Sequence, residues 1–188
     1  SYTGTTSPTL DATQDNNLVT NLTYQLRFQV SNNGTAIETY TKSLAAIAVG
    51  TNGHYGVSWD ASASTATFFE NGSSLGTVTG TFTAIYNSTA LFALGASFNA
   101  AGAAENFLDG ITDEWRIWSI ERTAAQMVAN KEIQLVGTEA GLNGNWQVNN
   151  STSDLTAYAN NLTLINTPVY TTTVPFSALS IVQIPKSP

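Results

Sequence analysis

Residues 107–118 read FLDGITDEWRIW and are followed at once by residues 119–123, SIERT. On a strand, side chains two residues apart point to the same face, so Glu114, Arg116 and Trp118 are expected to share one face. The opposite face then carries Ile111, Asp113, Trp115 and Ile117. This stretch predicts one strand with an ion pair and two tryptophans that turns directly into a helix.

The residues after that strand carry the signals of a helix start. Thr123 is a favoured N-cap residue, and Gln126, three positions later, completes a capping box. We expect one short α-helix at about residues 123–132, with Met127 and Val128 packed against the rest of the domain. The helix should end before Gly137.

Strand signals recur before the stretch at residues 107–118. Alternating apolar and polar residues, with the hairpin signals Asn33-Gly34 and Asn71-Gly72, predict several strands. These strands are expected at residues 26–30, 36–42, 54–60, 65–70, 75–81 and 90–96. Residues 97–106 are rich in Ala, Asn and Gly and predict a loop. Short strands separated by turn signals every 8–12 residues are typical of a β-sandwich.

Residues 113–118, with Arg122-Thr123 after them, resemble the signature of the laminin G-like domains of the concanavalin A-like lectin/glucanase superfamily. Residues 137–146, GTEAGLNGNW, resemble a second segment of that family, and residues 160–164 and 174–176 resemble further strands of it. The resemblance covers about residues 26–176. It implies an all-β fold: a two-sheet antiparallel β-sandwich with jelly-roll topology and one short α-helix.

We expect one sandwich domain at residues 23–170, a polar N-terminal arm or edge strand at residues 1–22, and a C-terminal strand or tail at residues 171–188. The family usually has opening strands before the point where this resemblance begins. A sandwich short of a strand exposes an edge, and exposed edges recruit strands. A terminal segment should therefore cover an edge of its own domain or of a neighbour.

Composition narrows the class of protein. The 188 residues carry a net charge of −7 with only six basic residues, which argues against a nucleic-acid partner. There is no cysteine, and no apolar run is long enough for a membrane span. A chain that starts at Ser1 fits a processed mature protein or a fragment. We expect an extracellular location or one on a cell or virion surface.

An enzymatic function is not expected. The glucanases of the superfamily use two glutamates flanking an aspartate on one strand, and that spacing is absent here, because Asp109 and Asp113 lie four apart and Glu114 follows directly. Glu114 is interpreted as the ion-pair partner of Arg116. His54 is the only histidine, so a multi-histidine metal site is excluded.

Candidate binding residues come mainly from the family resemblance. It implies a rim that can bind calcium, for which Asp60 or Asp109 is the candidate ligand, and the wider set of ligand-binding candidates is Asp60, Phe98, Asn99, Glu105, Asn106 and Asp109. The four tryptophans are expected in the core, while sugar stacking is open to Tyr55, Tyr86, Phe98 and Tyr158. Glycosylation sequons, which also match by chance in such a composition, occur at Asn21, Asn33, Asn71, Asn87, Asn149, Asn150 and Asn161.

Two functions remain open at this point. The first is a non-enzymatic extracellular binding or adhesion module, whose partner is a glycan or another cell-surface ligand; carbohydrate is the ligand that the resemblance implies. The alternative is a self-assembling structural subunit of a surface filament or virion, linked by strand exchange through its termini.

Overall fold

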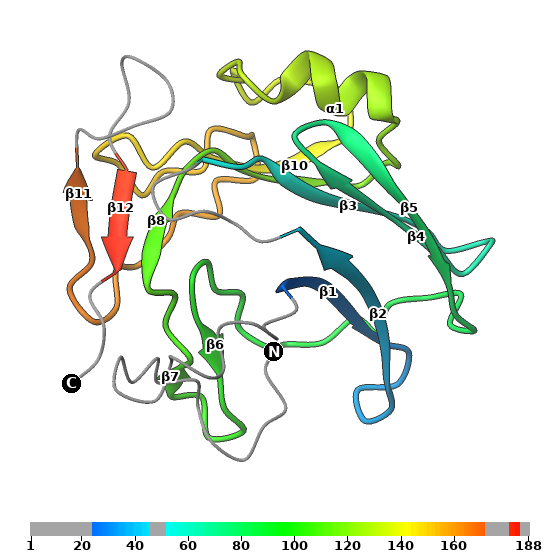
Figure 1. The fold of residues 1–188 in the computed structure, drawn as a ribbon. Helices are drawn as coiled ribbons and strands as arrows, with labels where there is room; N and C mark the ends of the chain where they lie inside the picture. The colour runs from blue at the N-terminus through cyan, green and yellow to red at the C-terminus, as the bar shows by residue number, and fades with distance from the viewer. Residues whose placement is uncertain (1–23, 46–51, 172–180, 185–188) are drawn as a thin grey trace, which may run out of the picture. The chain divides into compact units, whose positions relative to one another are not determined.

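The computed structural model describes residues 24–45, 52–171 and 181–184. The chain divides into two compact units, Ser1–Asn87 and Ser88–Pro188, and each is described by itself. Within the described residues every strand pair is antiparallel and there is one α-helix (Figure 1). The predicted all-β class with one short helix is confirmed.

The first unit opens with a hairpin of β1 (Tyr24–Ser31) and β2 (Ile37–Leu44). Its turn contains the predicted Asn33-Gly34 pair, with Gly34 at a φ of 82°. The side-chain Oδ1 of Asn33 accepts hydrogen bonds from the backbone N–H groups of Thr35 and Ala36, at 2.9 and 2.7 Å. An Asn side chain that caps its own turn in this way fixes the register of the hairpin.

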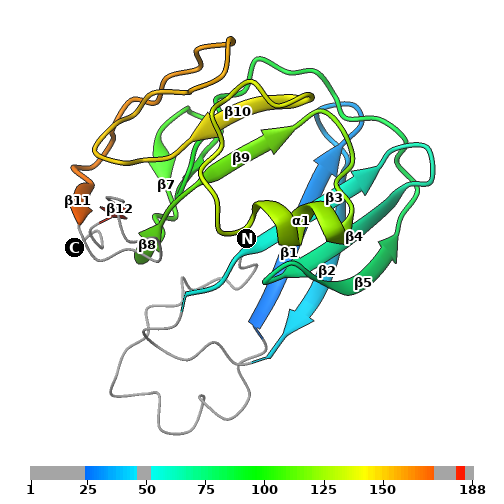
Figure 2. The ribbon, with the colours of Figure 1, turned by 90° about the horizontal axis from the view of Figure 1, so that it is seen from above.

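A three-stranded sheet completes the described part of the first unit. It consists of β3 (Tyr55–Asp60), β4 (Thr65–Glu70) and β5 (Ser73–Thr79), in the order β3-β4-β5. Figure 2 shows these three strands side by side. The predicted turn at Asn71-Gly72 joins β4 to β5, and Asn71 adopts a φ of 51°, which Asn tolerates better than most residues.

The core of the first unit lies between the hairpin and this sheet. Val30 and Tyr40 from the hairpin are buried together with Ala66 and Phe68 from β4. Phe28 joins the two layers, because its ring centre lies 5.8 Å from that of Tyr40 and 6.2 Å from that of Trp59. The alternation that predicted β1 thus places its apolar residues on the buried face.

The carboxylate of Glu38 ties β2 to the segment that follows β5. It accepts hydrogen bonds from the Tyr40 hydroxyl at 2.6 Å, from Thr81 N and Oγ1 at 2.6 and 2.8 Å, and from Phe82 N at 2.8 Å. Burial raises the pKa of Glu38, but these hydrogen bonds outweigh it and lower the pKa to about 2. The group therefore stays ionised and keeps its partners over most of the pH range.

In its described residues, the second unit contains three small sheets and the helix. The sheet orders are β6-β7, β10-β9 and β11-β12-β8. The elements are β6 (Ser97–Phe98), β7 (Ala104–Glu105), β8 (Gly110–Thr112), β9 (Trp115–Trp118), α1 (Ala124–Asn130), β10 (Leu142–Trp146), β11 (Val169–Thr171) and β12 (Ile181–Ile184).

The predicted single strand across residues 107–118 is wrong, because it is broken into β8 and β9. Glu114 has a φ of 53°, and its backbone N–H donates to Oδ1 of Asp113 at 3.0 Å, so the chain turns between the two strands. As a result, β8 pairs with β12 whereas β9 pairs with β10. Strand periodicity cannot reveal such a break, because the local hydrogen bond of an Asp side chain competes with the ladder.

The structure differs from the sequence-based prediction at three further segments. Residues 90–96 and 160–164 form no strand, although both are apolar enough for one. Residues 97–106 are not a simple loop but hold the hairpin β6–β7, because Oδ1 of Asn99 accepts from the N–H groups of Ala101 and Ala103, both at 3.0 Å. The strand expected at residues 174–176 lies outside the described residues.

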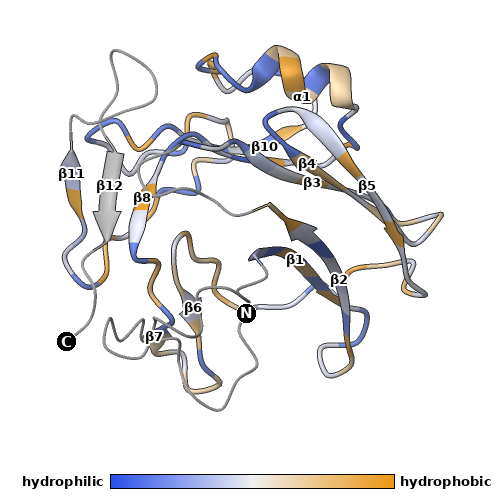
Figure 3. Cartoon of the chain, in the orientation of Figure 1, coloured by the Kyte–Doolittle hydropathy of each residue, from blue (hydrophilic) through white to orange (hydrophobic). Residues whose placement is uncertain are grey.

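Helix α1 begins as predicted. Thr123 is its N-cap, and both hydrogen bonds of the capping box with Gln126 are present. It ends at Asn130 and buries none of its residues, so the expected packing of Val128, which is 52% exposed, is wrong. Hydrophobic and hydrophilic residues alternate along it (Figure 3). No helix in the described ranges is long and apolar enough to span a membrane.

The C-terminal strand β12 lies in the middle of its sheet. Val182 pairs with Tyr170 of β11 on one side and with Thr112 of β8 on the other. A terminal segment therefore covers strand edges of its own unit, which is one of the two arrangements expected from the sequence.

Candidate functional site: an uncharged pocket in the second unit

The predicted ion pair of the signature is confirmed. Arg116 Nη2 lies 2.9 Å from Oε2 of Glu114, and the two side chains are only 9% and 7% exposed. Arg116 also donates through Nη1 to the backbone oxygen of Asn130, at 2.6 Å, and through Nη2 to that of Ile133. These carbonyls lie at and just beyond the end of α1. Arg116 therefore links β9 to the C-terminal end of the helix, which is a structural role.

Asp113 carries the buried carboxyl of this signature that lacks a full set of partners. Burial, helped by the charge of Glu114, raises the pKa of the Asp113 carboxyl to about 7. Its Oδ2 is buried and has no hydrogen-bond partner in the described part of the chain. Burial also raises the pKa of Glu114, although the hydrogen bond from Arg116 opposes that shift.

We expect Asp113→Asn to stabilise the protein at pH 8. The folded state holds the Asp113 proton up to about pH 7, whereas the unfolded chain releases it near pH 4. The favourable contribution of this carboxyl is complete below pH 4 and is lost as the pH rises through 7. Asparagine stays neutral and should gain about 1–2 kcal/mol at pH 8 after allowance for solvent screening. Denaturant unfolding at pH 4 and pH 8 measures this, and an equal midpoint shift at both would contradict it.

Trp118, the last signature residue, lies at the end of β9, where the chain turns toward α1. The guanidinium carbon of Arg122 lies 3.9 Å from the centre of its ring, within the range of a cation–π interaction. Trp118 is half-buried. It therefore contributes to this turn without belonging to the buried core.

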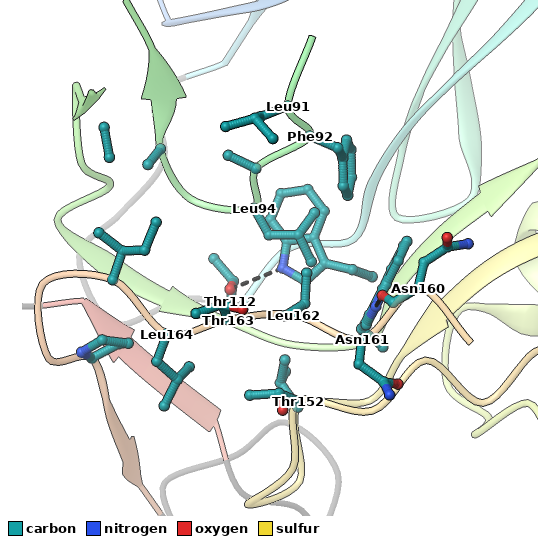
Figure 4. Close-up of a pocket in the computed structure, with 18 of the residues that line it drawn as sticks. Leu91, Phe92, Leu94, Thr112, Thr152, Asn160, Asn161, Leu162, Thr163 and Leu164 are labelled. Carbon is teal, nitrogen blue, oxygen red and sulfur yellow. Dashed lines mark hydrogen bonds between the residues drawn. The ribbon is translucent and has the colours of Figure 1, made fainter. Parts of the chain in front are cut away.

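A pocket of about 820 Å³ is built entirely from described residues of the second unit. One wall comes from the segment before β6, another from β8 to β10, and a third from the irregular segment at residues 152–170. Figure 4 shows Leu91 and Phe92 on one side and Thr152, Asn160 and Asn161 on the opposite side. Its size is that of a typical small-ligand pocket.

Aromatic side chains form much of the pocket. Trp146, only 3% exposed, stacks with Phe92 at 5.5 Å between ring centres. Its indole Nε1 donates to the backbone oxygen of Asn160, at 2.8 Å. Trp115 is fixed in the same way by Thr112 Oγ1, at 2.9 Å, and Tyr158, 63% exposed, offers a ring to solvent. The pocket thus combines anchored indoles with an accessible phenol.

Asp154 organises the polar side of the pocket. Its Oδ1 accepts from Asn145 N and Thr156 N at 3.0 and 2.9 Å, and its Oδ2 accepts from Asn160 N at 3.1 Å. Its own N–H donates to Oδ1 of Asn161, at 3.0 Å. Burial raises the pKa of Asp154, but these hydrogen bonds prevail and leave the pKa below its usual value. The carboxylate is saturated and holds Asn160, whereas the backbone N–H of Asp154 holds the side chain of Asn161.

None of the described residues that line the pocket is charged. Its polar groups are the hydroxyls and amides of Thr112, Asn143, Thr152, Tyr158, Asn160, Asn161, Thr163 and Tyr170. These groups can donate and accept hydrogen bonds, but none of them acts as a general acid or base near pH 7. The geometry suits binding of an uncharged ligand.

The structure brings Phe98, Asn99, Glu105 and Asn106 together at the hairpin β6–β7, where Nδ2 of Asn106 donates to Oε1 of Glu105 at 3.3 Å, but it does not gather the predicted ligand-binding residues around the pocket. Phe98 lines the pocket, but Asn99, Glu105, Asn106 and Asp109 are exposed residues that do not line it. Nδ2 of Asn106 donates to Ser97 Oγ, at 2.9 Å, so this side chain holds the hairpin β6–β7.

Asp60 belongs to the first unit, where Oδ1 accepts from Ser62 N, Ser62 Oγ and Ala63 N at 2.8, 2.7 and 3.1 Å. Its side chain therefore stabilises the turn between β3 and β4. No group of three or more Asp, Glu, His or Cys side chains in the described ranges could hold a metal ion. Calcium at Asp60 or Asp109 stays a prediction.

Sequence reasoning missed Phe92 and Asn160 as site residues and assigned Trp146 to the core alone. Tyr158 was considered for sugar stacking, and Asn161 only as a sequon. The adjacent Asn160-Asn161 pair, two residues after an aromatic residue, is the signal that could have been used. Among the sequons, Asn33, Asn71, Asn87, Asn150 and Asn161 are exposed, Asn149 is half-buried, and Asn21 lies outside the described residues.

One family model matches the chain. It is described as the concanavalin A-like lectin/glucanases superfamily, is of the laminin G type, and matches residues 2–128. Laminin G-like domains are generally binding modules and are typically extracellular. No curated protein and no solved structure gives a significant match.

The family match starts before residue 26, where we expected the family pattern to begin, and it stops before the block at residues 137–146. The first residues are too polar and too irregular for their membership to be recognised from periodicity. The match therefore does not support our expectation that the domain lacks the opening strands of the family.

Proposed function

Because this chain belongs to the concanavalin A-like lectin/glucanases superfamily, we propose that it is a non-enzymatic extracellular binding module whose ligand is a carbohydrate. The pocket of the second unit is the proposed site. The observation that carries the proposal is the lining of this pocket, which combines aromatic rings with amide and hydroxyl groups and has no charged residue among those described.

This lining matches the two kinds of surface on a sugar ring. The C–H face of a pyranose is apolar and packs on an aromatic ring, for which Tyr158 and Phe92 are accessible. The ring hydroxyls need hydrogen-bond partners when they lose water, and the amides of Asn160 and Asn161 can supply them. Binding by such groups needs no catalytic residue.

The acidic residues of the signature also favour binding over catalysis. Asp113 and Glu114 do not line the pocket, and Glu114 is engaged by Arg116. Hydrolysis of a glycoside needs two carboxyl groups on either side of the scissile bond. None of the described lining residues carries a carboxyl group.

A glycan array with the full chain tests the proposal, in buffer with calcium and in buffer with a chelator. We expect binding to at least one glycan and at least a tenfold loss in Tyr158→Ala, which removes the exposed ring at the pocket. Tyr24→Ala, which removes an exposed ring of the first unit, is the matched control and should bind as the wild type does. No binding to any glycan in either buffer would refute the proposal. Loss of binding with chelator would favour calcium.

A second candidate function is supported by the position of β12. This C-terminal strand is the middle strand of its sheet and provides all the described pairing of β8 and of β11. If β12 of one copy occupied that position in another copy, the chains would be linked by main-chain hydrogen bonds, as in a self-assembling subunit. Sizing of the chain with and without residues 181–184 separates this candidate from a monomeric binding module.

A further inference from the structure

We propose that the pocket binds a neutral 2-acetamido sugar and prefers it to the corresponding sugar with a 2-hydroxyl group. This inference rests on the proposed function, because it names the sugar class that the same pocket would take. Three features of the pocket support it: its lack of charge, its many apolar lining residues, and the donor and acceptor that Asn160 and Asn161 present.

The lack of charge disfavours acidic sugars. A carboxylate or sulfate in this pocket would lose water without meeting a cation among the described lining residues. The described basic residues of the second unit are engaged elsewhere: Arg116 with Glu114, Arg122 with Trp118, and Lys131 with Glu132. The net charge of −7 further opposes an anion. A positively charged sugar would likewise lose water without meeting a carboxylate among the described lining residues, so a neutral ligand is favoured.

The apolar lining of the pocket disfavours a fully hydroxylated sugar. Leu91 and Leu94 line the pocket from one wall, and Leu162 and Leu164 line it from the segment that also carries Asn161, as Figure 4 shows. A hydroxyl that is buried against such a wall loses its water and gains no partner, which weakens binding about tenfold for each group. A methyl group in the same place gains about fourfold from burial. The apolar lining therefore favours a sugar with a methyl-bearing substituent.

The polar side offers one donor and one acceptor that fit an amide. Asn161 uses Oδ1 to accept from Asp154 N, at 3.0 Å, which leaves its Nδ2 as a donor. Asn160 directs Nδ2 to Oδ2 of Asp154, at 3.4 Å, which leaves its Oδ1 as an acceptor. Both side chains are exposed and line the pocket. An acetamido group has a C=O to accept from Asn161 and an N–H to donate to Asn160, while its methyl group can pack on the leucines that line the pocket.

Calorimetric titration with paired sugars tests this inference. The probes are N-acetylglucosamine and N-acetylgalactosamine oligosaccharides, their 2-hydroxy counterparts and their deacetylated, positively charged counterparts. We expect the acetylated member of at least one pair to bind at least tenfold more tightly than the 2-hydroxy member. Asn161→Ala should reduce that preference to less than threefold, whereas Asn87→Ala, at an exposed Asn of the first unit, should leave it unchanged. A 6-deoxy sugar separates the contribution of a methyl group from that of an amide.

The possible outcomes distinguish a failure of the acetamido inference from a failure of carbohydrate binding itself. Tight binding of 2-hydroxy, 6-deoxy or charged sugars, without a preference for acetylated ones, overturns the acetamido inference but leaves carbohydrate binding intact. No binding of any sugar overturns both. If Asn161→Ala lowers the unfolding midpoint, Asn160→Ala supplies the second test, because it removes the proposed acceptor and only a long hydrogen bond of 3.4 Å to Asp154. A preference unchanged in both folded variants would contradict the assignment.

Discussion

Replacing Arg116 by alanine should lower the free energy of unfolding by about 3–5 kcal/mol, the usual cost of removing one partner from a buried ion pair. The substitution would leave the Glu114 carboxylate, whose side chain is 7% exposed, without its cation. It would also take the hydrogen bonds of Arg116 away from the backbone oxygens of Asn130 and Ile133, at the end of α1. Urea unfolding followed by tryptophan fluorescence measures the loss.

The control for this prediction is Arg122→Ala. That guanidinium lies over the ring of Trp118, a contact of the cation–π class that is worth about 0.5–2 kcal/mol. The double variant Glu114→Gln, Arg116→Met should recover part of the loss, because it removes the unpaired charge as well. A cost of less than 1 kcal/mol for Arg116→Ala would mean that the pair is solvated, and its role as a link to α1 would be wrong.

The same ion pair illustrates how far the sequence alone predicts this fold. The two-residue spacing of Glu114 and Arg116 correctly predicted their contact, although the backbone turns between β8 and β9 at Glu114. Capping residues and Asn-Gly turns were also predicted correctly, because their signals depend on bonds between near neighbours. Interactions between near neighbours can therefore be predicted from a single sequence.

The pocket could not be predicted in the same way. Its walls at residues 91–94 and 152–165 have no regular secondary structure, so strand periodicity assigned parts of them to strands. Their arrangement depends on contacts between residues far apart in the sequence, such as the stacking of Phe92 on Trp146. The saturated carboxylate of Asp154 fixes the polar wall, and nothing in its sequence neighbourhood distinguishes it from an ordinary loop aspartate.

Replacing Gly137 by alanine is the second substitution with a large expected effect, at least about 3 kcal/mol. Gly137 has a φ of 91°, a region that costs an L side chain about 1–3 kcal/mol. A Cβ there would also lie 2.1 Å from the backbone oxygen of Leu155 and 2.5 Å from its carbonyl carbon. Because backbone atoms cannot rotate away as a side chain can, the segment that holds Asp154 would have to move.

Gly102→Ala is the matched control, since Gly102 has a similar φ of 79° but a Cβ there would meet no atom within 4 Å. The difference between the two variants therefore measures the clash with Leu155, separately from backbone strain. Gly137→Ala should also weaken ligand binding under conditions where it remains folded, because Asp154 holds Asn160 and Asn161 at the pocket. Equal costs for the two variants would mean that the segment at residues 152–162 can move freely. The polar wall would then not be preorganised, and the positions of Asn160 and Asn161 could not determine which sugar binds.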